Sequence, residues 1–216
     1  MSVESTEVII LRITPYKESG IIAAGLSPDF GKVEFISHSG QKSGGTSTPA
    51  LDLYRHLQLS FKAPAAEKDG ALGTATEFEL IDEFSNLPRK VENLNFAAKI
   101  SRFILRNTIY ESPMPLLFDT LRQIFGQLSI ADVSSGTWTL RHCAVLLKLT
   151  FLYESGLLPE PENLPPEAVQ KVMAMYERLI ECAVDGSPLP PAGDQYYAQL
   201  DNYLNALIAA NNLPWK

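Results

Sequence analysis

The amino-acid sequence predicts an α+β protein, in which a five-stranded β-barrel at the N-terminus is followed by a bundle of α-helices. Two observations carry this prediction. Up to Phe84, apolar residues recur at strand spacing between Gly- and Pro-containing turns. From Leu87 onward, the apolar period is that of amphipathic helices. We therefore expect a barrel domain over residues 1–86 and a helical domain over residues 87–216.

Three strands joined by two tight turns are predicted near the N-terminus. Val8–Thr14 is rich in β-branched residues and stops at the turn Pro15–Gly20, which a strand interior would not tolerate. Ile21–Leu26 is a short apolar strand. It ends at Ser27–Gly31, where a proline presets one turn dihedral and a glycine supplies a positive one. Lys32–His38 mostly alternates polar and apolar residues, as expected of a strand with one wet face.

Two further strands complete the barrel. The stretch Ser39–Pro49 is rich in Gly, Ser and Thr and is expected to be a mobile loop. Leu51–Lys62 follows as a strand with a bulge at Tyr54–His56, and Ala63–Gly70 turns the chain toward the last strand, Gly73–Phe84. Five strands are typical of a small Greek-key barrel of the oligonucleotide-binding type, an OB-like barrel, although the pattern also allows an SH3-like barrel.

These motifs, in this order, resemble the N-terminal domain of the RecO family. The similarity lies in a strand ending in Leu-Arg-Ile-Thr-Pro-Tyr-Lys-Glu-Ser-Gly, a second strand, the turn Pro-Asp-Phe-Gly-Lys, and a third strand leading to a loop with a lysine. Gly73–Phe84 looks like the last barrel strand of that family. The resemblance extends over the whole chain and is strongest before Arg106. It implies a bacterial recombination mediator that binds and anneals single-stranded DNA.

The helical domain is expected to begin at Pro88 with an amphipathic helix that carries Arg102 and Arg106 on its exterior at i, i+4 spacing. Its inner face is predicted to hold Val91, Leu94, Phe96, Ala97, Ile100, Phe103, Ile104 and Ile109. The remaining predicted helices are Leu116–Leu128, Thr137–Ser155, Glu167–Val184 and Asp194–Asn211. The helix Thr137–Ser155 is nearly apolar throughout, which predicts a central place in the bundle.

The net charge of −7 argues against nonspecific binding to nucleic acid, so the distribution of charge matters more. Residues 1–80 carry a net charge of −3, residues 81–150 of +2, and residues 151–216 of −6. Any electropositive surface is therefore expected on the barrel rim and the first helices, and the C-terminal third is a poor partner for phosphate.

Neither a metal site nor an enzyme is predicted. Many RecO-like proteins carry a four-cysteine zinc module where this chain has the Pro-rich connector Leu157–Pro166. The candidate ligands His38, His56, His142, Cys143 and Cys182 lack the short local spacing that zinc requires. We expect both cysteines to face the core. Phosphate-binding and hydrolase motifs are missing as well, so we expect no cofactor and no small-molecule substrate.

Single-stranded nucleic acid crosses OB-like barrels over strands and turns, where cations bind phosphates and aromatic rings stack on bases. The candidates on the barrel are Arg12, Lys17, Lys32 and Lys42 for phosphate, and Tyr16, Phe30 and Phe35 for bases. Arg89, Lys90, Lys99, Arg102 and Arg106 would extend this track at the domain junction. Exposed Lys and Arg residues are also ordinary on an amphipathic helix.

The resulting hypothesis is a non-enzymatic DNA repair and recombination mediator whose barrel binds single-stranded DNA. The resemblance alone implies RecR-like and single-strand-binding proteins as partners, assistance in loading RecA, and association with the bacterial nucleoid. The competing hypothesis is a RecO-derived adaptor that binds proteins and has lost DNA binding, which the acidic net charge would suit. No stretch approaches the roughly 18 apolar residues of a membrane span, and the start of the chain is acidic, so the sequence predicts a soluble cytoplasmic protein.

Overall fold

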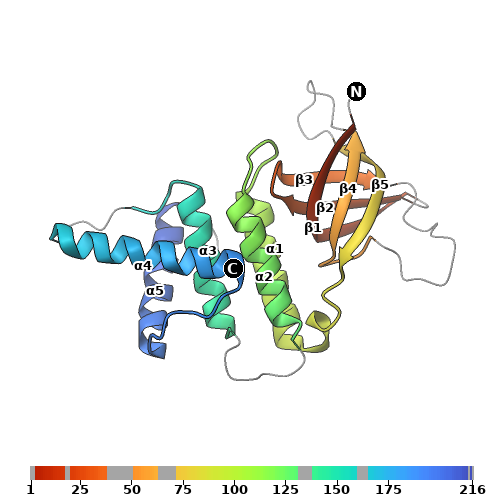
Figure 1. Ribbon diagram of the computed structural model, residues 1–216. Helices are drawn as coiled ribbons and strands as arrows, with labels where there is room; N and C mark the ends of the chain where they lie inside the picture. Colours follow the sequence, from red (N-terminus) through yellow and green to blue (C-terminus); the bar gives the residue numbers. More distant parts are fainter. Residues whose placement is uncertain are drawn as a thin grey trace. The chain divides into compact units, whose positions relative to one another are not determined.

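The computed structural model describes residues 3–17, 20–37, 51–62, 72–130, 138–159, 165–213 and 215. Within these residues the chain forms five strands followed by a short 3₁₀ helix and five α-helices (Figure 1). The strands are β1 (Val3–Tyr16), β2 (Gly20–Ser27), β3 (Gly31–Ser37), β4 (His56–Lys62) and β5 (Gly73–Asp82). The helices are η1 (Leu87–Arg89), α1 (Val91–Asn107), α2 (Pro115–Leu128), α3 (Leu140–Glu154), α4 (Pro166–Asp185) and α5 (Asp194–Ala210).

The strands close into a barrel in the order β1-β2-β3-β5-β4, which confirms the predicted fold class. All neighbours are antiparallel except β3 and β5, which run parallel and pair over Phe35–Gly73 and Ile36–Thr74. Closure pairs strands that would otherwise expose backbone donors and acceptors at an edge. Inside lies a core of apolar side chains from β1 to β4, with Leu51: Val8, Ile10, Ala23, Val33, Phe35, Leu51, Leu57, Leu59 and Phe61.

Several strand boundaries differ from those predicted, and β1 begins at Val3 instead of Val8. β1 continues through Pro15, which is paired with Ile21 of β2. The pairing of β1 with β4 ends at Ile9, so the proline occupies a stretch with one strand neighbour, where a missing N–H is tolerated. β4 begins only at His56, because Tyr54 has a φ of +62° and turns the chain. The predicted bulge therefore becomes the entry to the strand, and the loop Ser39–Pro49 and the turn Ala63–Gly70 lie outside the described residues.

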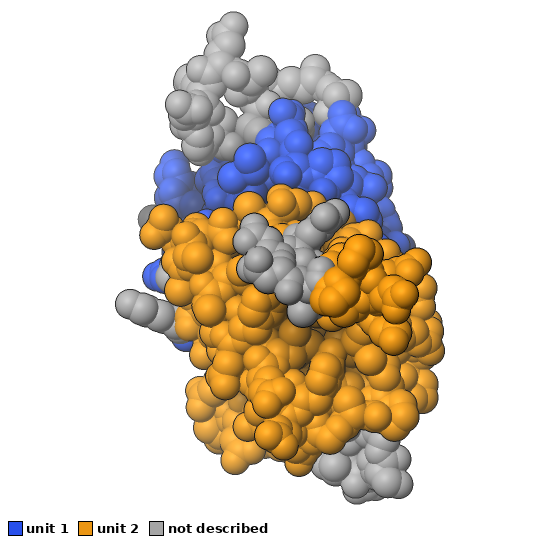
Figure 2. All heavy atoms as spheres, turned by 90° about the vertical axis from the view of Figure 1, so that its left-hand side faces the viewer, with its two compact units in different colours: residues 1–85, 100–118 blue, residues 86–99, 119–216 orange. Residues whose placement is uncertain are grey.

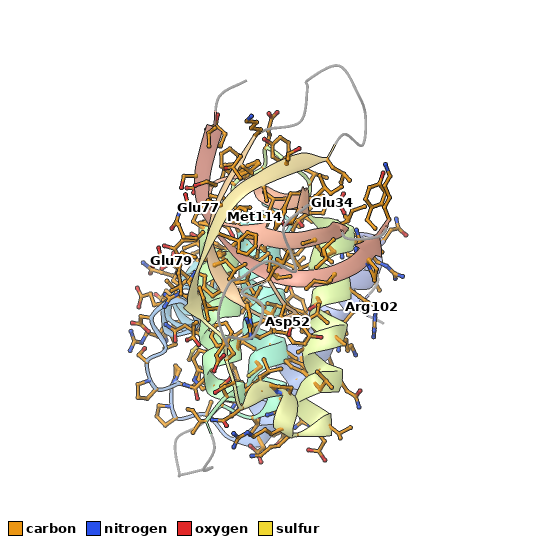
Figure 3. The ribbon with its side chains drawn as sticks, turned by 90° about the vertical axis from the view of Figure 1, so that its right-hand side faces the viewer. Glu34, Asp52, Glu77, Glu79, Arg102 and Met114 are labelled. Carbon is orange, nitrogen blue, oxygen red and sulfur yellow. The ribbon has the colours of Figure 1, made fainter. Side chains whose placement is uncertain are left out.

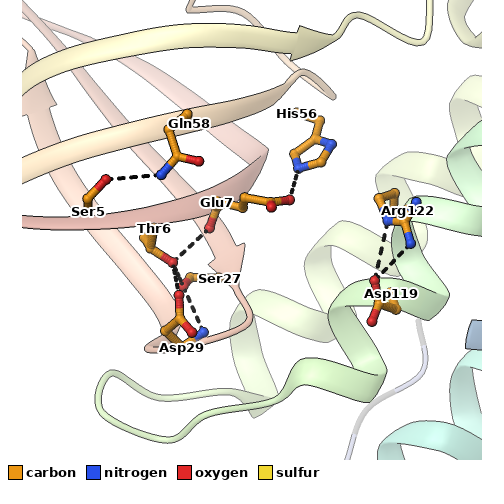
Figure 4. Close-up of polar contacts among 9 residues, drawn as sticks. All are labelled: Ser5, Thr6, Glu7, Ser27, Asp29, His56, Gln58, Asp119 and Arg122. Atoms are coloured by element: carbon orange, nitrogen blue, oxygen red, sulfur yellow. Dashed lines mark hydrogen bonds and ion pairs between the residues drawn. The ribbon is translucent and has the colours of Figure 1, made fainter.

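The turn between β2 and β3 is held by a small polar network. Thr6 Oγ1 donates to Asp29 Oδ2 at 2.6 Å and lies 2.8 Å from Ser27 Oγ (Figure 4). Ser27 Oγ in turn accepts the backbone N–H groups of Asp29 and Phe30, both at 3.2 Å. Because Thr6 and Ser27 are buried, these hydrogen bonds satisfy hydroxyls that have lost water. The network fixes the turn that leads into β3.

The segment after α1 packs on this same turn. The Lys32 backbone N–H donates to the carbonyl of Ile109 at 3.1 Å, and the Met114 N–H donates to the carbonyl of Pro28 at 3.1 Å. Gly31 also forms an isolated bridge with Tyr110. The end of α1 and the start of α2 are thus bound to the barrel by backbone hydrogen bonds as well as by side chains.

Contacts divide the chain into two compact units, coloured separately in Figure 2. The barrel unit contains residues 1–85 and 100–118, and the helical unit contains residues 86–99 and 119–216. The first unit therefore takes in the second half of α1 and the start of α2. The boundary at residues 86 and 87 remains our proposal for the domain division.

The helices lie close to their predicted bounds, although the inner face predicted for α1 is too long. Ala97, Ile100, Phe103 and Ile104 are buried, whereas Val91, Leu94 and Ile109 are 72%, 38% and 68% exposed. Val91 is the first helical residue, and Ile109 lies beyond the end of α1 at Asn107, so neither follows the periodicity of the helix interior. Among the described residues, the structure contains no helix with the length and apolar character required to cross a membrane.

Candidate nucleic-acid interface

The outer surface of β1, β2 and β3 is defined by strand register. Ile13, Ala23 and Phe35 pair across the three strands and point into the core. The neighbouring rows must then point outward, because side chains alternate along a strand. These rows are Arg12, Ala24 and Glu34, followed by Thr14, Ile22 and Ile36. Together with Lys32, these residues are called the β1–β3 face below.

Arg12 is the most exposed cation of this face, with 54% of its side chain accessible. Its Nη2 donates to Glu34 Oε1 at 2.5 Å, across Ala24 of the intervening strand. Lys32 is half-buried on β3, two residues before Glu34, and therefore points to the same side of the sheet. The face thus presents two cations and one carboxylate in adjacent positions.

The β1–β2 hairpin adds a cation and an aromatic ring at one end of this face. Lys17 is exposed, and its Nζ lies 5.1 Å from the centroid of the Tyr16 ring. A cation above a ring is stabilised by the ring quadrupole. Tyr16 and Lys17 therefore form a compact group with one surface for a base and one charge for a phosphate.

The two phenylalanines considered for base stacking have other roles. Phe35 has no exposed surface and belongs to the barrel core, because its side chain is on the inward-facing side of β3. Phe30 is half-buried, with its ring 5.6 Å from Phe61 and stacked at 6.0 Å on Tyr110. A ring without exposed surface cannot stack on a base, so we leave Phe35 out of the proposed interface.

Ile22 and Ile36 provide apolar surface that the sequence analysis did not assign to the site. They are paired with each other in the outward row beside Thr14, and both are half-buried. Bases stack on apolar as well as aromatic surfaces when the strand is unpaired. The alternation of β3 could have identified Ile36 as a surface residue. If Phe35 points into the core, then Lys32, Glu34 and Ile36 all point outward.

The opposite side of the barrel is acidic. Glu77 and Glu79 of β5 are exposed and are paired with Ser60 and Gln58 of β4. Gln58 donates to Ser5 on β1 at 3.0 Å, and Glu7, next along that face of β1, lies 2.7 Å from His56 Nε2 (Figure 4). Figure 3 shows Glu77 and Glu79 on one side of the barrel and Glu34 and Arg102 on the other. The carboxylates of β5 make that side unfavourable for phosphate.

Arg102 and Arg106 are exposed on the part of α1 that belongs to the barrel unit. Arg102 lies close enough to Tyr54 to favour its ionised form, although burial raises the pKa of this phenol overall. The backbone N–H of Tyr54 donates to the carbonyl of Ile10 at 2.8 Å, two residues before Arg12. Arg102 therefore lies near a residue that is hydrogen-bonded to β1 just before the β1–β3 face.

The remaining predicted cations are placed elsewhere or lie outside the described residues. Arg89 and Lys90 are exposed in and after η1, within the helical unit. Lys99 is half-buried in the same unit, with its Nζ 5.2 Å from the ring centroid of Trp215. Lys42 lies outside the described residues. The structure places Arg12, Tyr16, Lys17 and Lys32 on the sheet formed by β1, β2 and β3, with Tyr16 and Lys17 at the hairpin end and Lys32 toward the other end. Arg102 and Arg106 belong to the same unit.

The apolar helix α3 contains a charge that the sequence analysis overlooked. Lys148 is fully buried, and its Nζ donates to Asp201 and, at 2.8 Å, to Asn205 of α5. Nζ also lies 5.0 Å from the ring centroid of Trp215. Burial lowers the pKa of Lys148, and the hydrogen bond and charge of Asp201 oppose that shift. This arrangement satisfies a buried cation and joins α3 to α5.

The cysteines are buried and free, as predicted. Burial raises the pKa of the Cys143 thiol to about 12, so this thiol is a weak nucleophile at neutral pH. Within the described part of the chain, no group of three or more His, Cys, Asp or Glu side chains is arranged to hold a metal ion.

Comparison with known proteins supports the predicted family. Residues 1–84 match the family model described as "Recombination protein O N terminal". A DNA repair protein RecO of Listeria welshimeri is 23% identical over 183 residues, which cover 85% of this chain and 60% of the relative. The corresponding protein of Halalkalibacterium halodurans is 23% identical over 117 residues, covering 54% of this chain and 44% of the relative.

The chain thus spans about 60% of the length of the Listeria relatives that it matches. The matched N-terminal segment coincides with the closed barrel, whose last strand ends at Asp82. These matches bear out the resemblance predicted from the sequence: residues 1–84 match the RecO N-terminal domain, and most of the chain is similar to proteins named DNA repair protein RecO.

Proposed function

We propose that this protein acts in DNA repair and recombination as a RecO-like mediator that binds single-stranded DNA through the β1–β3 face. The observation that carries this proposal is the sidedness of the barrel. One side presents Arg12 and Lys32 around Glu34, next to the half-buried Ile22 and Ile36. Figure 3 shows Glu77 and Glu79 on the other side of the barrel from Glu34. A strand of DNA requires phosphate-binding charge next to a surface for its bases.

In this proposal each group has a distinct role. Arg12, Lys17 and Lys32 bind phosphates, and Arg102 and Arg106 extend that track along α1. Tyr16 offers a ring for stacking, while Ile22 and Ile36 contact the bases with aliphatic surface. Lys42, Arg89 and Lys90 stay in the proposal on the basis of sequence. The mediator is not an enzyme, because its task is to hold one strand available for pairing.

Relatives named DNA repair protein RecO support the repair role of this chain. Annealing of complementary strands and assistance in loading RecA are further parts of the proposal. They rest on the resemblance to the RecO family, as do RecR-like and single-strand-binding proteins as partners.

The test is the salt dependence of binding to a labelled single-stranded oligonucleotide, measured by fluorescence anisotropy. Contacts with about three to five phosphates predict a slope of log affinity against log salt of about −2 to −3.5. Reversal of charge at Arg12, Lys17 and Lys32 together should remove most of the binding. Reversal at Lys171 and Arg178, which are exposed on α4, is the control for a general change of charge and should change affinity little.

The adaptor hypothesis predicts a different result in the same experiment. The ion pair of Arg12 with Glu34 favours this alternative, because it partly neutralises the most exposed cation of the face. A folded protein that shows no binding at low salt would contradict the mediator proposal. Binding with a flat salt response would place the contacts on Tyr16, Ile22 and Ile36 rather than on the cations.

A further inference from the structure

We infer that Glu34 is an internal competitor for the phosphate-binding site of Arg12, so that a phosphate of single-stranded DNA must displace the Glu34 carboxylate to reach the Nη2 donor of Arg12. The inference rests on the proposed function and specifies how the β1–β3 face is regulated. It makes Glu34 a residue that sets the affinity and salt dependence of DNA binding without contacting the DNA favourably.

The geometry of the ion pair supports direct competition. Arg12 and Glu34 occupy one outward row, on either side of Ala24, and their side chains meet at 2.5 Å between Nη2 and Oε1. A carboxylate and a phosphate use the same donors of a guanidinium group in the same planar arrangement. A phosphate that binds the Nη2 donor of Arg12 therefore has to take the place of Glu34.

The exposure of the pair makes the exchange possible. The side chain of Arg12 is 54% accessible and that of Glu34 is 30% accessible, so both charged groups lie within reach of a strand crossing the face. Exposed ion pairs are weak, because water and salt screen them. The pair can thus open at low cost, unlike the buried contact between Lys148 and Asp201.

The position of Glu34 between two cations adds a second effect. Lys32 lies two residues earlier on the same side of β3, and Arg12 lies across β2. A phosphate that bridges these cations passes close to the carboxylate and is repelled by it. Neutralising Glu34 therefore releases Arg12 and also removes the repulsion.

The experiment compares Glu34→Gln with the wild-type protein in binding to a labelled poly-dT oligonucleotide over a range of salt concentrations. Loss of the competing ion pair should tighten binding about three- to fivefold at low salt. Because no carboxylate then neutralises Arg12 in the free protein, one more net positive charge meets the phosphates, and the slope of log affinity against log salt should become steeper by about 0.7. Glu79→Gln is the matched control, because it makes the same change of charge on the acidic side of the barrel and should leave binding unchanged.

A double-mutant cycle separates release of Arg12 from a general change of charge. In an Arg12→Gln background, the gain from Glu34→Gln should fall to less than half of its value in the wild-type background. An equal gain in both backgrounds, or unchanged or weaker binding by Glu34→Gln, would overturn the inference while leaving the proposed function standing. Absence of binding by the folded wild-type protein would instead remove both.

Discussion

Two glycines with left-handed backbone angles differ in their surroundings. Gly31, in the turn before β3, has a φ of +66°, and a Cβ there would lie 2.6 Å from the carbonyl oxygen of Ile109 and closer still to that of Ser112. Gly156, after α3, has a φ of +68°, and nothing lies within 4 Å of the same point. Gly31 is needed both for its positive φ and because a side chain would clash with neighbouring atoms, whereas Gly156 is needed for its positive φ alone.

Substitution by alanine should separate these two requirements. Gly156→Ala should lower the free energy of unfolding by about 1 kcal/mol, the cost of a left-handed conformation with a side chain. Gly31→Ala should cost about 3 kcal/mol, because the clash with two carbonyl oxygens adds to that term. Urea unfolding of both variants measures the two losses of stability. Equal losses would show that residues 109–112 can move away from the turn at little energetic cost.

Lys148 and Asp201 form a buried pair whose members differ in access to water. Lys148 has no exposed surface, whereas the side chain of Asp201 is 25% exposed. If Lys148 is replaced by Met, Asp201 can still be hydrated, and a flexible apolar chain fills the space. If Asp201 is replaced by Ala, the ammonium group stays buried with only Asn205 and the Trp215 ring among the contacts described above.

We therefore expect Asp201→Ala to be the more damaging change. It should destabilise the protein by about 3–5 kcal/mol, as expected when one partner of a buried ion pair is removed, and Lys148→Met should cost clearly less. Thermal and urea unfolding measure both effects. A larger loss for Lys148→Met would indicate that the hydrogen bonds of the ammonium group contribute more than the cost of burying it.

At the scale of single elements, the start of α3 is held by side-chain hydrogen bonds. Its N-cap Thr139 accepts the backbone N–H of His142, and His142 Nδ1 accepts the backbone N–H of Thr139, both at 3.2 Å. This is a capping box with histidine in the position usually taken by Glu or Gln. Burial lowers the pKa of His142, an effect that Arg141 strengthens and Asp194 opposes. Protonation of Nδ1 would remove the acceptor.

The capping box should therefore weaken in acid. Because the folded pKa of His142 lies below its ordinary value of 6.5, its contribution to stability is complete above pH 6.5 and is lost as the pH falls through the folded value. His142→Gln keeps a capping-box acceptor that does not titrate. The difference in urea midpoint between the wild-type protein and this variant should shift in favour of the variant as the pH falls below 6.5. A constant difference across that range would contradict a role for His142 titration.

For the molecule as a whole, the division of contacts suggests that the barrel does not end with its last strand. Residues 100–118 belong to the barrel unit, where the ring of Phe118 lies 5.5 Å from that of His56 and Tyr110 stacks on Phe30. A fragment ending at residue 86 would lose these contacts and expose the apolar side chains beneath them.

We expect a fragment of residues 1–118 to unfold cooperatively and to be more stable than a fragment of residues 1–86. The reason is that only the longer fragment retains the hydrogen bonds from Lys32 to Ile109 and from Met114 to Pro28. Chemical unfolding followed by circular dichroism compares them. Equal stability would support the sequence-based boundary at residues 86 and 87 as the true limit of the barrel domain.

The sequence by itself determined the elements and their types. The turn residues Pro28 and Gly31, alternation in β3 and helical periodicity after Leu87 depend on neighbours along the chain, so they could be interpreted locally. The same holds for the exposure of Arg102 and Arg106, which follows from their place on an amphipathic helix. Arg12 and Lys17 could be chosen as candidates from the sequence because the strand and turn that carry them were recognisable locally. Pro15 could not be interpreted locally, because whether β1 has one or two strand neighbours there depends on the fold.

Only the tertiary structure decided which of these residues share a surface. The inward position of Phe35, the outward row of Ile22 and Ile36, and the pairing of Arg12 with Glu34 all depend on register between strands. Lys148 could not be recognised in α3, because its partners Asp201 and Asn205 lie more than 50 residues away along the chain. The local sequence pattern reflects interactions between residues that are close along the chain. Charge pairing and burial depend on segments that come into contact only when the chain folds.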